Sequence, residues 1–377
     1  MLRMLPDLAG AAAVAVWLYL LVGRGGFWRM RDAPRELALA DPAPAIVAVV
    51  PARNEAAVVE RAIASLAGQR YPGRFHIVLA DDRSSDGTAD IARAAAPPGI
   101  LTVVQAGPLP AGWTGKLWAM AEGVRRAATL QPDYLLLTDA DIVHPPDTLA
   151  VLAARGDYDL VSFMATLSCR TPAERALIPA FVFFFFMLYP PAWVRSPRRS
   201  TAAAAGGCML IRRAMLERIG GLDAIRGELI DDCALARGVK RQGGRVSLGL
   251  SAATRSIREY AGWGEVGRMI SRSAFSQLRY SVVLLIGTVL GLALTYLVPP
   301  VLVFSGRMPA AVLGGSAWLL MSVAYYPSLR FYRRSPLWAP ALPLIALFYL
   351  GATVHSAVAW WRGKGGEWKG RDLRKSE

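Results

Sequence analysis

Four stretches of this sequence are apolar over most of the length needed to cross a lipid bilayer: residues 8–23, 282–305, 309–328 and 338–361. A helix needs about 20 consecutive apolar residues to cross the bilayer core. The chain of 377 residues is 54% hydrophobic and only 19% charged, whereas soluble domains carry about 25% charged residues. The sequence therefore predicts a membrane protein, and its hydrophobicity excludes a disordered chain.

Arginines beside these runs predict the orientation of the chain. Three of them follow the first run, at Arg24, Arg29 and Arg31. Because short loops rich in Lys and Arg stay in the cytoplasm, we expect the stretch after residue 24 to face the cytoplasm of a bacterial inner membrane. A cleaved signal peptide is the alternative, but no small-residue cleavage motif follows Gly23. The crossing of 338–361 stays open, because it would export the basic tail 362–377.

A further apolar run, residues 176–193, lies within the mixed-polarity middle of the chain and contains four consecutive phenylalanines. Pro179, Pro190 and Pro191 interrupt or bound it. A span here would place two halves of one domain on opposite faces of the membrane. We therefore expect an element that dips into one leaflet, with a true span and a buried core helix as the alternatives.

Short apolar runs, of which 45–50 is β-branched, alternate with helical patterns between residues 45 and 138. The expected strands are 45–50, 75–80, 100–104 and 134–138, and the expected helices are 54–66, 88–96 and 116–130. This alternation predicts an α/β fold whose mostly parallel sheet carries helices on both faces. Ligands of such sheets bind at the carboxyl ends of the strands.

Acidic clusters stand at two of these strand ends, Asp81-Asp82 and Asp139-Ala140-Asp141. Adjacent carboxylates repel each other unless a cation or hydrogen-bond donors compensate their charge. Carboxylate oxygens in such an arrangement suit Mg²⁺ or Mn²⁺ that bridges phosphates. The alternative is a local role in the turn at 81–86 and in strand-end solvation and helix capping after Asp141.

Four segments occur in a fixed order, "VVPARNEAAVVERAIASL", "VLADDRSSDGT", "LTDADIV" and "ELIDDCALA". Together they resemble the family 2 glycosyltransferases, nucleotide-sugar enzymes of GT-A fold, over about residues 45–280. Four more, "GWTGKLWAM", "AGGCMLIRR", "AFSQLRYS" and "EWKGRD", are similar to ceramide glucosyltransferase-like membrane enzymes and most of all to hopene-associated glycosyltransferases. The resemblance implies inverting, metal-dependent transfer of a sugar from a uridine diphosphate donor to a membrane lipid, such as a hopanoid.

The resemblance also implies a set of donor-binding residues: Pro51, Arg53, Glu55, Asp81, Asp82, Lys116 and Asp139. In this set Asp82, with Asp81, would accept hydrogen bonds from the uracil and its ribose. Asp141 would hold Mg²⁺ or Mn²⁺ together with Asp139. Lys116 is the only lysine before residue 240, and it either contacts the diphosphate or is a solvated surface residue.

On the acceptor side, Asp231 and Asp232 match the family's acidic pair, whose first member is usually Glu. The resemblance implies that Asp232 is the general base for the acceptor hydroxyl, although a helix N-terminus also favours an Asp pair. The family's Gln/Arg-x-x-Arg-Trp motif has its nearest counterpart in Gln277 and Arg279, on the acceptor and diphosphate side, with a different spacing and aromatic residue. Arg268 or Arg272 is the alternative. The stretch 258–280, with aromatic residues between arginines, is equally consistent with a helix that lies on anionic lipid instead of binding substrate.

The predicted organisation is a transmembrane helix at 1–24, a cytoplasmic GT-A domain at 40–280 with the membrane-dipping segment 176–193, a transmembrane region at 281–361 and a basic tail at 362–377. The net charge of +15 fits an anionic membrane surface, and we reject nucleic acid as a partner. Cys169, Cys208 and Cys233 show no metal or disulfide spacing. His144 is expected in a loop rather than as a metal ligand.

Two other functions compete with lipid glycosylation. A processive polysaccharide synthase would need more membrane crossings and the intact Trp-containing motif. A catalytically silent nucleotide-binding scaffold would not need Asp82, Asp139, Asp141 and Asp232 together. We therefore favour transfer of a sugar from a nucleotide to a membrane lipid.

Overall fold

The computed structural model describes residues 4–33 and 38–364, which divide into two compact units. The sheet unit comprises described residues of 31–168 and 193–258, and the helical unit those of 1–30, 169–192 and 259–365. The expected GT-A range 40–280 includes 169–192 and 259–280, which group here with the helical unit. Most of the expected basic tail, 362–377, lies outside the described residues.

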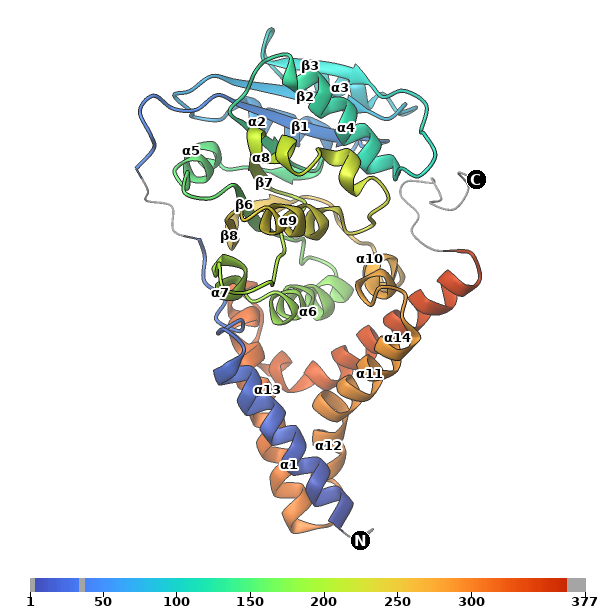
Figure 1. Ribbon diagram of the computed structural model, residues 1–377. Helices are drawn as coiled ribbons and strands as arrows, with labels where there is room; N and C mark the ends of the chain where they lie inside the picture. The colour runs from blue at the N-terminus through green and yellow to red at the C-terminus, as the bar shows by residue number, and fades with distance from the viewer. Residues whose placement is uncertain (1–3, 34–37, 365–377) are drawn as a thin grey trace. The chain divides into compact units, whose positions relative to one another are not determined.

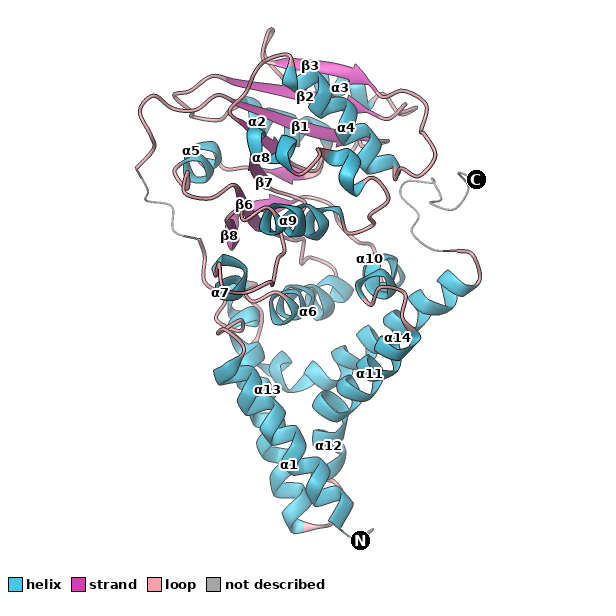
Figure 2. Cartoon of the chain, in the orientation of Figure 1, coloured by secondary structure: helices cyan, strands magenta, loops and turns pink. Residues whose placement is uncertain are grey.

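The sheet unit contains every strand of the described residues (Figure 2). They are β1 (Ile46–Ala52), β2 (Phe75–Asp81), β3 (Leu101–Gln105), β4 (Tyr134–Leu137), β5 (Ile142–Val143), β6 (Leu160–Thr166), β7 (Met209–Arg212) and β8 (Val246–Ser256). They form one sheet in the order β3-β2-β1-β4-β7-β6-β8-β5. The first four are parallel, β7 runs antiparallel to both of its neighbours, and β5 runs antiparallel to β8.

Helices follow β1, β2 and β3 as the sequence predicts, and further helices lie between the later strands. They are α2 (Val59–Ala67), α3 (Thr88–Ala94), α4 (Gly115–Ala128), α5 (Thr148–Ala153), α8 (Arg213–Arg218) and α9 (Asp231–Arg241). The predicted α/β fold is confirmed, and the sheet is parallel in its first half and mixed in its second. All of β1 is buried, as expected for a parallel strand that is covered on both faces.

Helix α4 packs against β1 and β2 (Figure 1), and at Gly123 the helix lies close to the sheet. A Cβ atom at this position would lie 2.5 Å from Val49 Cγ1 in β1 and 3.3 Å from Ala80 Cβ in β2. We expect Gly123→Ala to lower the free energy of unfolding by about 1–3 kcal/mol, because overpacking forces the sheet and helix apart.

The matched control is Gly238→Ala in α9, where the nearest atom to a new Cβ is Ile219 Cδ1 at 3.4 Å. There the better helix propensity of alanine, worth about 1 kcal/mol, is expected to preserve or raise stability. Thermal or denaturant unfolding of the two variants measures the difference. Equal melting temperatures would contradict the close approach of α4.

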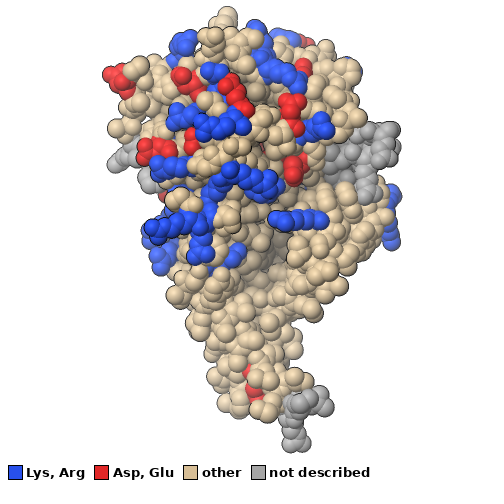
Figure 3. All heavy atoms as spheres, in the orientation of Figure 1, with Lys and Arg blue, Asp and Glu red and all other residues tan. Residues whose placement is uncertain are grey.

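The described part of the helical unit consists of helices, most of them apolar. They are α1 (Leu5–Leu18), α6 (Pro172–Leu188), α10 (Trp263–Gln277), α11 (Val282–Leu292), α12 (Val298–Val303), α13 (Met308–Phe331) and α14 (Leu342–Trp361). The short helix α7 (Pro191–Arg195) follows α6 after Tyr189 and Pro190, and its residues from 193 on belong to the sheet unit. Small residues bring the apolar helices close together, since a Cβ at Gly10 of α1 would lie 2.8 Å from Leu313 Cβ of α13. The surface over α1, α12 and α13 shows almost no charged side chains (Figure 3).

Five helical segments are long and apolar enough to cross a membrane: Leu5–Gly23, Pro172–Arg195, Val282–Val303, Met308–Phe331 and Pro336–Trp361. These properties are compatible with a membrane-associated protein. The phenylalanine run of α6 packs within the helical unit, where Phe183 contacts the rings of Phe27 and Tyr325. Helix α6 thus has the contacts of a core helix as well as the length and composition of a span.

Candidate active site

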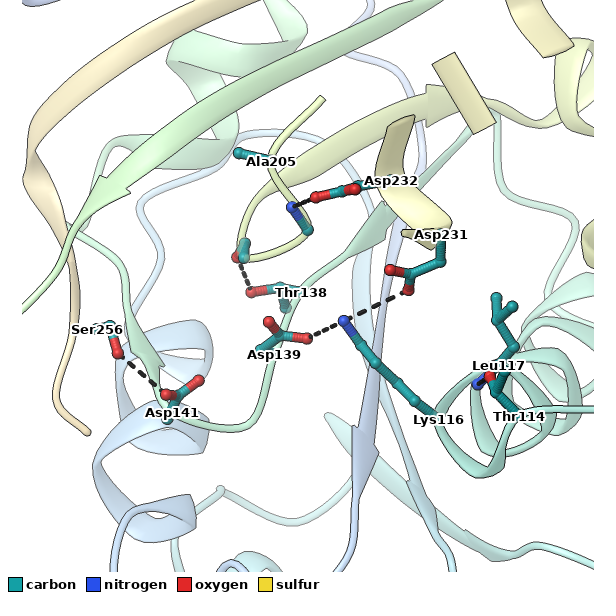
Figure 4. Close-up of polar contacts among 12 residues, drawn as sticks. Thr114, Lys116, Leu117, Thr138, Asp139, Asp141, Ala205, Asp231, Asp232 and Ser256 are labelled. Carbon is teal, nitrogen blue, oxygen red and sulfur yellow. Dashed lines mark hydrogen bonds and ion pairs between the residues drawn. The ribbon is translucent and has the colours of Figure 1, made fainter. Parts of the chain in front are cut away.

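Carboxylates from two distant parts of the sequence meet around one lysine (Figure 4). Asp139 follows β4, and Lys116 lies in the first turn of α4, where the Thr114 side chain caps the helix. Lys116 Nζ is 2.9 Å from Asp139 Oδ1 and 3.4 Å from Asp231 Oδ2. The lysine therefore neutralises part of a cluster that joins the expected donor side to the expected acceptor side.

The charged groups of this cluster shift one another's pKa values. Only a third of the Asp139 side chain is exposed, and burial raises its pKa even though Lys116 opposes the shift. Burial alone would lower the pKa of Lys116, but the neighbouring carboxylates of Asp139 and Asp231 raise it overall. Lys116 therefore stays charged at neutral pH and serves as a fixed counter-ion.

Asp231 and Asp232 begin α9 and have different surroundings. Asp231 faces Lys116, whereas Asp232 accepts backbone hydrogen bonds from Gly206 N at 2.9 Å and from Cys233 N at 2.7 Å. Burial, and next the charge of Asp231, raises the pKa of Asp232 to about 6. A carboxylate with such a pKa accepts a proton more readily than an ordinary aspartate and is still ionised at pH 7.

Asp141 is held by residues that sequence reasoning did not assign to the site. Its Oδ2 accepts hydrogen bonds from Ser256 Oγ at 3.0 Å and from Arg258 Nε at 3.0 Å. Arg258 Nη2 also contacts both carboxylate oxygens of Glu55, at 2.7 and 2.8 Å. The sequence placed Arg258 in the stretch 258–280 read as a lipid-facing helix, but that helix begins at Trp263.

The expected nucleotide residues lie at the carboxyl ends of β1 and β2. Pro51 is a buried residue of β1. Arg53 Nη1 donates to the Asp82 carbonyl oxygen at 2.5 Å and lies 3.4 Å from Asp82 Oδ2. Asp81 Oδ2 accepts a hydrogen bond from Ser84 N at 3.2 Å, which is the turn contact of the alternative reading. The carboxylates of Asp81 and Asp82 are both buried.

His144 is buried in a short hydrogen-bonded chain beside the site. Thr138 Oγ1 donates to Gly207 O at 2.7 Å, so it accepts from His144 Nε2 at 2.9 Å. Burial lowers the pKa of His144 to about 4, which keeps the ring neutral at physiological pH. These contacts hold the loop whose Gly206 supports Asp232.

Gln277 and Arg279 belong to the helical unit rather than to the sheet unit. Gln277, the last residue of α10, donates from Nε2 to Tyr189 Oη at 2.5 Å. Arg279 follows the helix with a φ of 52°. Their expected role toward the diphosphate therefore stays a prediction.

Asp139 and Asp141 are the residues that could hold a divalent cation, with a substrate supplying further ligands. No group of three or more His, Cys, Asp or Glu residues suited to a metal occurs among residues 4–33 and 38–364. Mg²⁺ in phosphate-transfer sites is typically bound by one or two carboxylates, with water and substrate phosphates as the remaining ligands. Asp139 and Asp141, separated only by Ala140, provide such a partial ligand set.

Comparisons with known structures support the same fold. A mannosyltransferase from Pyrobaculum calidifontis, in complex with GDP-Man and Mn²⁺, is 19% identical, covers 93% of this chain and 98% of its own, and gives a TM-score of 0.60. Glucosyl-3-phosphoglycerate synthase from Mycobacterium tuberculosis, in complex with Mg²⁺ and UDP, is 18% identical over 66% of this chain and 85% of its own, with a TM-score of 0.43. At these identities the first likeness shows the fold, and the second carries no argument.

Sequence comparisons give the family. No curated protein matches the chain in sequence. The family model described as "Glycosyltransferase like family 2" matches residues 42–274, which is more than half of the chain and includes all the carboxylates around Lys116. The chain therefore belongs to family 2 of the glycosyltransferases, nucleotide-sugar-dependent transferases, and has their GT-A fold.

Proposed function

We propose that this glycosyltransferase moves a single sugar from a uridine diphosphate donor to a hydroxyl group of a membrane lipid, with inversion at the anomeric carbon. The observation that carries the proposal is Lys116, which contacts Asp139 of the donor side and Asp231 of the acceptor side. Donor and acceptor carboxylates thus form one cluster, in a chain with five apolar helices of membrane-spanning length.

On the donor side, Asp141 and Asp139 would hold Mg²⁺ or Mn²⁺. When bound, the cation would neutralise the charge that develops on the departing diphosphate. Arg53 and Asp82 are already joined at the ends of β1 and β2, where nucleotides bind in parallel α/β sheets. With Pro51, Glu55 and Asp81 they are the proposed nucleotide-binding residues.

On the acceptor side, Asp232 is the proposed general base. Its raised pKa of about 6 suits a group that must be ionised at pH 7 and yet take a proton from an attacking hydroxyl. The backbone N–H groups of Gly206 and Cys233 fix the orientation of its carboxylate. Asp231, paired with Lys116, would help to position the acceptor and the diphosphate.

The acceptor is proposed to be a lipid, because the chain is apolar and basic in the pattern of a membrane enzyme. We place the sheet unit at the cytoplasmic face of a bacterial inner membrane, following Arg24, Arg29 and Arg31. Segment 176–193 would then meet the lipid at the bilayer, and Gln277 and Arg279 would act on the diphosphate side. The "GWTGKLWAM" and "AGGCMLIRR" segments, similar to hopene-associated enzymes, favour a hopanoid.

The test is transfer by the purified protein in lipid, supplied with Mn²⁺ or Mg²⁺, a panel of nucleotide sugars and lipid extract from a hopanoid-producing bacterium. We expect one hexose or N-acetylhexosamine increment in the mass of a lipid. A ladder of increments would instead support a processive synthase. Donor binding without transfer to any lipid of a wide acceptor panel would overturn the proposal in favour of a silent scaffold.

A further inference from the structure

Arg258 is bound by two acidic residues of the donor side at once. Its Nε lies 3.0 Å from Asp141 Oδ2, and its Nη2 lies 2.7 Å from Glu55 Oε1. The side chains of Asp141 and Glu55 are only 11% and 9% exposed, and that of Arg258 is 32% exposed. The guanidinium therefore takes the place of a counter-cation at the carboxylate proposed to bind the metal.

The backbone holds Arg258 near Asp141 independently of this ion pair. Strand β5 pairs with the end of β8, with Ile142 opposite Ser256, and Ile257 N donates to the Asp141 carbonyl oxygen at 2.9 Å. The guanidinium can therefore leave the carboxylate by side-chain rotation, without loss of the strand pairing. An arginine in this position competes with any cation that approaches Asp141 Oδ2.

A divalent cation alone must displace a permanently charged guanidinium from a largely buried carboxylate. A nucleotide diphosphate favours the cation over the guanidinium at Asp141 in two ways. Its oxygens complete the coordination of the cation, and they offer the displaced guanidinium a new bidentate partner. We propose that Arg258 is a positioning residue that keeps Asp141 from binding the divalent cation until a nucleotide diphosphate arrives, so that cation binding requires the nucleotide.

This inference rests on the proposed role of Asp141 as a cation ligand, and the experiment separates the two. Binding of Mn²⁺ is measured by electron paramagnetic resonance, with and without UDP or GDP, for the full chain in detergent. The variants are Arg258→Gln, Arg258→Lys and Asp141→Asn. Arg93→Gln is the matched control, because it removes an arginine from an exposed aspartate pair of the same unit, Arg93–Asp90.

For the wild type and Arg93→Gln we expect weak Mn²⁺ binding that tightens strongly when nucleotide is added. For Arg258→Gln we expect Mn²⁺ alone to bind about tenfold more tightly, which corresponds to about 1.4 kcal/mol, and the effect of nucleotide to shrink. Arg258→Lys keeps the positive charge and should stay near the wild type. Melting curves of each variant identify any that fail to fold. Arg258→Lys shows whether an effect of Arg258→Gln comes from loss of the positive charge or only from a change of side chain.

The experiment can contradict the competition by Arg258 and the metal role of Asp141 separately. If Arg258→Gln binds Mn²⁺ alone no more tightly than the wild type, while Asp141→Asn loses Mn²⁺ binding, the competition by Arg258 is wrong and the metal role of Asp141 stands. If Asp141→Asn binds Mn²⁺ and nucleotide like the wild type, or if the wild type binds no Mn²⁺ with either nucleotide, the metal role fails and the inference fails with it.

Discussion

Asp232→Asn is expected to abolish sugar transfer while donor binding stays close to that of the wild type. The asparagine keeps the size of the side chain, but it cannot take a proton from the acceptor. Its single amide oxygen can accept from only one of the two backbone donors, Gly206 N and Cys233 N, which donate to different oxygens of Asp232. Loss of a general base lowers the rate by about 10²–10⁴-fold. Single-turnover transfer and binding of UDP to the same preparation measure the two effects.

A stability measurement distinguishes this loss from misfolding. The pKa of Asp232 is about 6 in the folded protein because of burial and Asp231, well above that of an unfolded aspartate. The folded state therefore binds the proton more tightly than the unfolded chain, and it loses stability as pH rises from about 4 to about 6. At pH 7 the uncharged Asp232→Asn removes the cost of this buried charge but loses one of the two backbone hydrogen bonds, so it should stay folded with a melting temperature close to that of the wild type. An inactive variant that fails to fold, or that loses UDP binding, would contradict the assignment.

Lys116→Met is expected to have the second large effect, a loss of kcat/KM on the order of 100-fold. Removing one partner of a buried charged contact costs about 1–3 kcal/mol, and a loss of this size in the transition state gives such a factor. The methionine retains the length of the side chain but leaves Asp139 and Asp231 without the ammonium group 2.9 and 3.4 Å away. Lys116→Arg, which keeps the charge, is the control and should retain more of the activity.

The pH profile gives this prediction a second readout. The charge of Lys116 lowers the pKa of Asp232, so its removal should raise that pKa above about 6. The general base must be ionised, and the wild-type activity should therefore fall as pH drops below about 6. In Lys116→Met this fall should begin at higher pH, measured as kcat/KM between pH 5 and 9 at a fixed, saturating cation concentration. An unchanged profile would show that Lys116 does not act on Asp232.

The parallel half of the sheet could be predicted because its signals are local. The observed strands β1 to β4 coincide with short apolar runs, and each expected helix appears after its strand. Helix α2 begins at Val59 rather than at residue 54, because Asn54 has a φ of 51° and Glu55 N donates to Thr88 Oγ1 in the next βα connection. Such a contact joins residues that the sequence keeps far apart.

The candidate site was predicted only in part, for a similar reason. The acidic residues could be found because they follow strands and match family motifs. Arg258 could not, because its place beside Asp141 depends on the antiparallel pairing of β5 with β8, which are over a hundred residues apart in the chain. Gly206 contributes a backbone N–H, and a backbone donor has no side chain to mark it in a sequence.

The order of strands in the sheet has a consequence for synthesis of the protein. Strand β4, in the middle of the sheet, pairs with β7, and the apolar α6 is translated between them. The ribosome therefore delivers a 24-residue apolar segment, Pro172–Arg195, before the central strand has its second neighbour. Until β7 emerges, the edge of β4 is open to pairing with other chains. Early capture of α6 by the membrane or its insertion machinery would hold the nascent chain in place while the sheet closes.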